Sequence, residues 1–139
     1  MSIREQAIAA IVAQLQNLGA FSVVRNEAVP AEVGETGHVI IRDGSRLDAQ
    51  ATLGVHSWWI SHHVVIEAQA GGDDPDTTLD LMLQAIDATL SADPTLGGVV
   101  LTCTLDLDDI DVVAGDGASA IKSVLLGAVL EYESGNALD

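Results

Sequence analysis

The fold of this chain is decided by residues 58–69, which read WWISHHVVIEAQ. Every second residue from Trp58 to Ala68 is apolar apart from His62, whereas the positions between them mix polar and apolar side chains. Successive side chains of a β-strand point to opposite faces, so this alternation is typical of a strand that is buried on one side. The pattern predicts a long strand from Val55 to Ala70 with one mainly apolar face.

A second alternating segment spans residues Ser119 to Glu133. One of its faces carries Lys122, Val124, Leu126, Ala128, Leu130 and Tyr132, and the opposite face includes Ile121, Leu125 and Val129. A sheet that is also half apolar on its outer face exposes more hydrophobic surface than a small monomer usually does. We therefore expect a partner subunit to cover the outer face of these two strands.

Two helices are predicted from their capping residues and apolar spacing. Ser2 and Glu5 form a capping box at the start of a helix that continues to Leu18. Asp74 and Pro75 are suited to begin a second helix. The apolar stripe of this second helix consists of Leu79, Met82, Leu83, Ile86 and Leu90.

The remaining elements are shorter. Strands are predicted at 20–25, at 38–42 and from residue 99 to about 107, with a hairpin turn at Asp43-Gly44 and an acidic loop from Asp106 to Gly117. Residues 45–54 are compatible with an irregular or an extended arm. The predicted fold class is α+β, a mostly antiparallel or mixed sheet with two helices on one face, in the order α-β-β-β-α-β-β. Residues 1–133 are expected to form one domain, followed by a disordered tail at 134–139.

The charge of the chain excludes several kinds of partner. Its 139 residues include 21 acidic and 5 basic ones, for a net charge of −16. Residues 71–139 alone hold 14 acidic residues and one basic residue, a net of −13. Such a chain cannot offer phosphates a basic surface, so we expect no specific binding to nucleic acid or to an anionic membrane. No apolar run approaches the roughly 20 residues of a membrane-spanning helix.

Residues with catalytic or metal-binding chemistry are few. Cys103 is the single cysteine and lies in an apolar run typical of a buried strand. His62 and His63 point to opposite faces of their strand and cannot bind one metal ion locally. The acidic run that starts at Asp106 has Gly117 at its twelfth position, where an EF-hand calcium loop needs glutamate. The sequence therefore predicts no metal, no cofactor and no enzymatic activity.

The order of these elements resembles the tail terminator proteins of long-tailed phages, the minor tail protein U family, also called tail completion proteins. The resemblance covers residues 2–133. Its features are the opening helix, the loop with Pro30 before the strand at 38–42, and the long strand with Trp59 and the run at 64–67. They continue with an acid-headed helix that ends in Asp93-Pro94, an Asp-rich segment, and a final strand that ends at 130–133.

This resemblance implies a structural role in the virion. Proteins of that family form a six-membered ring on the head-proximal end of the tail tube, stop the tube from growing and provide the surface to which the head is joined. The implied partners are further copies of the chain, the tail tube protein and a head-completion or connector protein, with assembly in the host cytoplasm. DNA passes through such a ring, so an acidic channel that repels phosphate would suit it.

The candidate site residues follow from these expectations. The acidic residues proposed to line the lumen or rim are Asp106, Asp108, Asp109, Asp111 and Asp116. The candidates for subunit or tube interfaces are Trp58, Trp59, Leu125, Val129, Glu32 and Glu35, and the loops at 27–37, 43–56 and 107–118 are the expected contact segments. The alternatives are another head–tail connector or neck protein, a small ligand-binding α+β domain with a deep polar pocket, and a salt-adapted protein of unrelated function.

Overall fold

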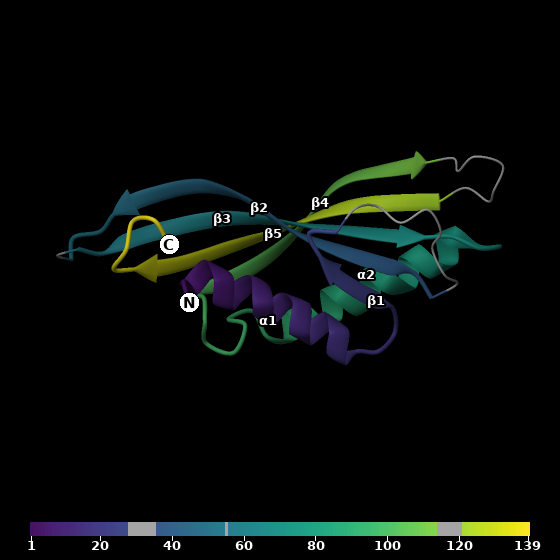
Figure 1. Cartoon of the computed structure of the whole chain (residues 1–139), viewed down its shortest axis with the longest axis horizontal. Coiled ribbons are helices and arrows are strands. Elements are labelled where there is room, and N and C mark those ends of the chain that lie inside the picture. Colours follow the sequence, from purple (N-terminus) through teal and green to yellow (C-terminus); the bar gives the residue numbers. More distant parts are fainter. Residues whose placement is uncertain (28–35, 55, 114–120) are drawn as a thin grey trace.

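The computed structural model describes residues 1–27, 36–54, 56–113 and 121–139. Its elements are α1 (Ile3–Asn17), β1 (Ser22–Arg25), β2 (His38–Ala51), β3 (Trp58–Ala70), α2 (Pro75–Ala92), β4 (Thr102–Val113) and β5 (Ile121–Ser134). The strands form one sheet in the order β1-β2-β3-β5-β4 (Figure 1). Strand β1 runs parallel to β2, and the other neighbouring pairs are antiparallel. The predicted α+β class and element order are confirmed.

Both helices cover the same face of this sheet (Figure 1). At the start of α1, the Ser2 hydroxyl oxygen accepts a hydrogen bond from the Glu5 N–H at 3.0 Å. At the start of α2, an Asp74 carboxylate oxygen accepts one from the Thr77 N–H at 3.3 Å. These caps satisfy N–H groups that have no partner inside the helix. The helices bury the side chains of Ala7, Ile8, Ile11 and Leu15 from α1, and of Leu79, Met82, Ile86 and Leu90 from α2.

The core lies between the helices and the apolar faces of β3 and β5. The burial of β3 alternates as predicted, with Ile60, Val64 and Ile66 fully buried. In β5, the predicted inner face is buried from Val124 to Tyr132. Leu96 follows α2 and closes this core from a turn, since its side chain is only 2% exposed.

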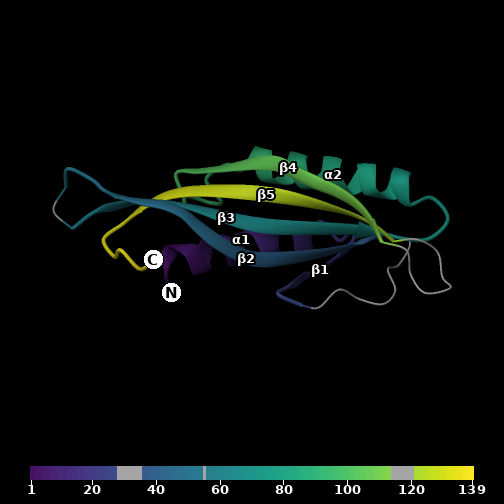
Figure 2. The same cartoon turned by 90° about the horizontal axis from the view of Figure 1, so that it is seen from above.

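The predicted hairpin turn at Asp43-Gly44 is wrong. Strand β2 continues through it to Ala51, and the pairing with β3 shifts register between Arg42 and Ser45. Gly44 adopts a positive φ of +67° inside this irregularity. A β-bulge and a tight hairpin turn both favour such a residue, so the local signal was the same for either structure. The hairpin instead closes after Ala51, and its tip projects beyond the helices (Figures 1 and 2).

The predicted acidic loop is wrong over most of its length, because β4 extends to Val113. The register of β4 with β5 shifts between Leu107 and Asp109, so that Asp108 is an additional residue in the strand. Apolar and acidic residues alternate before Asp108 and again after Asp109, and the bulge accommodates the extra residue where the two runs meet. The many acidic residues of this segment favoured a loop, although its apolar and acidic residues alternate with the period of two that is typical of a strand. The strand also begins at Thr102 rather than at residue 99.

Residues 134–139 were expected to be disordered, but the structure folds them back onto α1 and the end of β5. The Asp139 carboxylate accepts hydrogen bonds from the Ile3 N–H at 2.8 Å and from the Ser134 hydroxyl at 2.7 Å. The Tyr132 hydroxyl and the Arg46 guanidinium donate to the main-chain oxygen of Asp139 at 3.1 and 3.0 Å. The contacts of Asp139 with Ile3 and Arg46 join residues that are far apart in the sequence, and composition gives no sign of them.

Candidate functional site

The sheet face opposite the helices carries an apolar patch, which we call the open face and define by Val65, Leu125 and Val129. Val65 of β3 is paired with Gly127 of β5, which has no side chain. The three defining residues are all half-buried. They do not belong to the core that the helices and the sheet form, nor to the residues that pack against it. Both helices pack on the other face of the sheet (Figure 1), so none of the described helices covers these residues. The open face therefore has the composition of a surface that a partner covers.

The two tryptophans at the start of β3 point to opposite faces of the sheet. Trp58 is partly buried and packs against the core. Trp59 is 38% exposed and lies on the side of the open face, in register with Glu133 of β5 and Gln50 of β2. The alternation of side chains along a strand predicted that Trp58 and Trp59 would lie on opposite faces. Of the two candidate interface tryptophans, Trp59 is the one available to a partner.

An ion pair borders the open face on β2 and β3. A guanidinium nitrogen of Arg42 lies 3.0 Å from a carboxylate oxygen of Glu67, and Arg42 also donates to the main-chain oxygen of Glu27 at 3.2 Å. The Gln69 amide donates to the other carboxylate oxygen of Glu67 at 3.1 Å. The negative charge of Glu67 is thus compensated by the positive charge of Arg42, and Glu67 does not add an unpaired charge to the apolar patch.

The acidic candidates do not form one loop. Asp106, Asp108, Asp109 and Asp111 all belong to β4. Among the four, Asp106 is the residue whose side chain the structure describes, and it is exposed. Asp116, Glu32 and Glu35 lie outside the described residues. Of the three expected contact loops, 43–56 belongs largely to the β2–β3 hairpin, and 107–113 is strand.

The bulge in β2 is held by buried and charged side chains. His62 of β3 is only 4% exposed, and its Nε2–H donates to the main-chain oxygen of Asp43 at 2.5 Å. Burial lowers the pKa of His62, which favours the neutral imidazole. The Arg25 guanidinium contacts a carboxylate oxygen of Asp43 at 2.8 Å and holds the pKa of that carboxyl below its usual value. These contacts give His62 and Asp43 a structural role.

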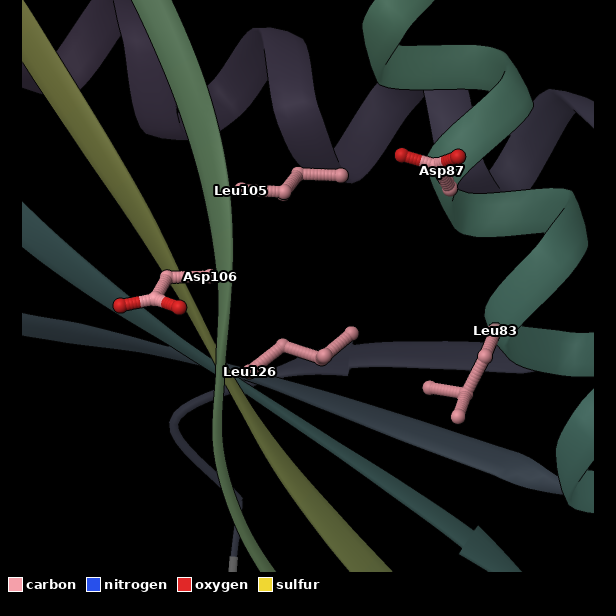
Figure 3. Close-up of a pocket in the computed structure, with 5 residues that line it drawn as sticks. All are labelled: Leu83, Asp87, Leu105, Asp106 and Leu126. Atoms are coloured by element: carbon pink, nitrogen blue, oxygen red, sulfur yellow. The ribbon is translucent and has the colours of Figure 1, made fainter.

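An apolar groove lies between α2 and β4. It has a volume of about 270 Å³ and is lined by Leu83, Asp87, Leu105, Asp106 and Leu126. Figure 3 shows the three leucine side chains pointing into the space between the helix and the strand, while Asp106 turns to the other side of β4. The groove was not among the sites predicted from the sequence. Leu105 and Asp106 lie near the end of the strand predicted from residue 99 to about 107, but their alternation does not indicate that a helix lies beside them.

The chemistry of the described residues is that of a surface for contacts. Burial raises the pKa of the Cys103 thiol to about 11, so the thiol stays protonated and unreactive near neutral pH. Among residues 1–27, 36–54, 56–113 and 121–139, no group of three His, Cys, Asp or Glu side chains could hold a metal ion. Neither α1 nor α2 is long and apolar enough to cross a membrane, and they are the helices of the described part.

No family model matches the chain, and no curated protein matches it. Among solved structures, the chain is similar to one from a particle described as "Virion of native gene transfer agent (GTA) particle". The sequence identity is 15%, the match covers 89% of this chain and 93% of the other, and the TM-score is 0.45. At these values the likeness carries no inference about this chain.

Proposed function

We propose that this chain is a structural protein of a phage-like particle, and that copies of it form a ring that closes the head-proximal end of a tail tube. The observation that carries the proposal is the open face, where Val65, Leu125 and Val129 lie outside the core that the described helices cover. The resemblance of residues 2–133 to tail terminators supports the same role. In this role the chain is not an enzyme and needs no cofactor.

The charge of the chain fits an assembly through which DNA passes. A surface with a net charge of −16 per subunit repels phosphate and lets DNA slide. The same charge opposes ring closure, because six copies would carry six times −16, about −96. Apolar contacts made by the open face would have to outweigh this repulsion. Salt or magnesium should therefore favour the ring by screening.

The test is the mass of the purified chain in solution by light scattering, over a range of protein concentration and with or without millimolar magnesium. We expect a six-fold species that is favoured by magnesium. A dimer as the sole assembled species would contradict the ring. Electron microscopy of negatively stained samples should show the same species as a ring with a central opening.

Variants of the open face connect this test to the structure. Val65→Asp and Leu125→Asp place a charge on the proposed contact surface and should leave the chain monomeric. Ala13→Asp adds the same charge to an exposed position of α1, on the other side of the molecule, and should leave assembly unchanged. Circular dichroism of each variant establishes that it is folded. If Val65→Asp and Leu125→Asp assemble as well as Ala13→Asp, the open face is not the contact surface.

A further inference from the structure

The edge of the sheet at β4 combines three features that point to a binding partner. The first is the groove of about 270 Å³ beside this edge, whose apolar walls are Leu83 of α2, Leu105 of β4 and Leu126 of β5 (Figure 3). Leu83 and Leu105 are both half-buried. An apolar side chain that entered the groove would remove their exposed surface from water.

The second feature is the strand edge itself. Strand β4 ends the sheet order, and within the described part of the chain β5 is its one partner strand. Thr102, Thr104 and Asp106 are exposed along this first half of β4. The outer edge of such a strand presents main-chain N–H and C=O groups to which another strand can bind.

The third feature is charge. Asp87 and Asp106 border the groove on its two sides, and neither forms an ion pair with another described residue. The Ser91 hydroxyl donates to Asp87 at 3.1 Å, which leaves the negative charge in place. Both carboxylates are on exposed residues. A positively charged partner would therefore be attracted to Asp87 on the groove side and to Asp106 on the opposite side of β4.

We propose that a strand of another protein, in which apolar and basic residues alternate, adds to the free edge of β4 at Thr102–Asp106. Neighbouring residues of paired strands point to the same face. The apolar side chains of the added strand would enter the groove beside Leu105, and its basic side chains would lie beside Asp106 on the other face. This pattern of alternation follows from the placement of Leu105 and Asp106 on opposite sides of β4.

A second copy of the chain does not have the required charge. The chain has five basic residues. Arg25 and Arg42 are in ion pairs with Glu5, Asp43 and Glu67, Lys122 pairs with Asp76, and Arg46 donates to the main chain of Asp139. The fifth basic residue, Arg4, belongs to helix α1 and is therefore not part of a segment that could add as a strand. The proposed partner is therefore a different protein, and the proposal does not depend on ring formation.

The probe for the test is a short fluorescent peptide of alternating lysine and valine, with a peptide of alternating glutamate and valine as its counterpart. Fluorescence anisotropy at low salt measures binding to the full chain. We expect the lysine peptide to bind and the glutamate peptide not to bind. Asp87→Lys combined with Asp106→Lys should weaken binding of the lysine peptide by about tenfold or more.

The matched control combines Asp48→Lys with Asp73→Lys. Both residues are exposed and neither lines the groove, so the pair changes the net charge by the same amount at other places, with Asp48 on β2 and Asp73 before α2. We expect this control to keep most of the affinity of the original chain. Equal loss of affinity in the two double variants would show attraction to the overall charge and would overturn the proposal. A lysine peptide that does not bind at all would overturn it too.

Strand addition has a second signature. Hydrogen exchange followed by NMR should show that the peptide slows exchange of main-chain amides within Thr102–Asp106, because new hydrogen bonds form at the free edge. Amides on α2 should show no comparable slowing. Binding without protection on β4 would mean that the peptide occupies the groove without extending the sheet, and it would refute the proposed mode.

Discussion

Gly44 of β2 approaches His63 of β3 so closely that a Cβ atom on Gly44 would lie 1.7 Å from the main-chain oxygen of His63. Gly44 also has a φ of +67°, which costs other residues energy. We therefore expect Gly44→Ala to lower the free energy of unfolding by about 3 kcal/mol or more, from backbone strain and the clash together. Urea unfolding measures this change.

Gly97→Ala provides the matched control. Gly97 has a similar φ of +73°, but a Cβ atom there would have no neighbour within 4 Å. In this variant the free energy of unfolding should fall only by the cost of placing alanine in a left-handed backbone conformation, about 1–2 kcal/mol. If the two variants are equally stable, the close approach of Gly44 to the neighbouring strand does not contribute.

The bulge at Gly44 illustrates which parts of this fold could be predicted from the sequence. The alternation in β3 and β5 repeats over many residues, so the buried faces could be assigned before the structure was known. Asp43-Gly44 is a signal of two residues, and it favours a bulge as much as a turn. The difference depends on whether the next residues pair with β3, which is information that the local sequence does not contain.

The candidate site shows the same distinction. The open face followed directly from the alternation that places Leu125 and Val129 opposite the core. The groove beside β4 could not be predicted, because it depends on how far α2 lies from Leu105. The spacing between two elements is set by the packing of the whole core.

Arg25 should control how stability responds to acid. Its guanidinium nitrogens lie 2.6 and 2.8 Å from the two carboxylate oxygens of Glu5, and its Nε contacts Asp43. Hydrogen bonds from Arg25 lower the pKa of Glu5 and of Asp43 from their usual values of 4.5 and 3.8. The stabilisation is present above those values and is lost as the pH falls through the lower values of the folded state.

We therefore expect Arg25→Met to reduce the stability near neutral pH and to flatten its decline in acid. The measurement is the unfolding midpoint in urea at a series of pH values, at low and at high salt. Arg4→Met removes the same charge from a position where no ion pair is found among the described residues. If both variants have the same acid profile, the contacts of Arg25 do not stabilise the chain.

His62 should produce a separate pH dependence nearer to neutrality. Its burial lowers its pKa from the usual 6.5, so the unfolded chain takes up the proton at a higher pH than the folded chain. The contribution to stability is thus complete above the unfolded value and declines as the pH falls below it. The charges near the imidazole are those of Arg4, Asp43 and Arg46.

We expect the free energy of unfolding to fall between about pH 7 and pH 5 in the original chain. His62→Gln keeps an N–H donor for the main-chain oxygen of Asp43 but does not titrate, so this part of the decline should disappear. His56→Gln changes an exposed histidine and serves as the control. A decline that persists in His62→Gln would assign the effect to another group.

Asp139 should stabilise the start of α1, since its carboxylate accepts hydrogen bonds from the Ile3 N–H and the Ser134 hydroxyl. The first N–H groups of a helix have no partner within it, and a side-chain acceptor there is worth about 1 kcal/mol. We expect Asp139→Ala to lower the free energy of unfolding by about 1–2 kcal/mol. Leu138→Ala should be nearly neutral, because Leu138 is 79% exposed. If Asp139→Ala is equally neutral, residues 134–139 do not hold α1 in solution, and the disorder expected from the sequence is the better description of that segment.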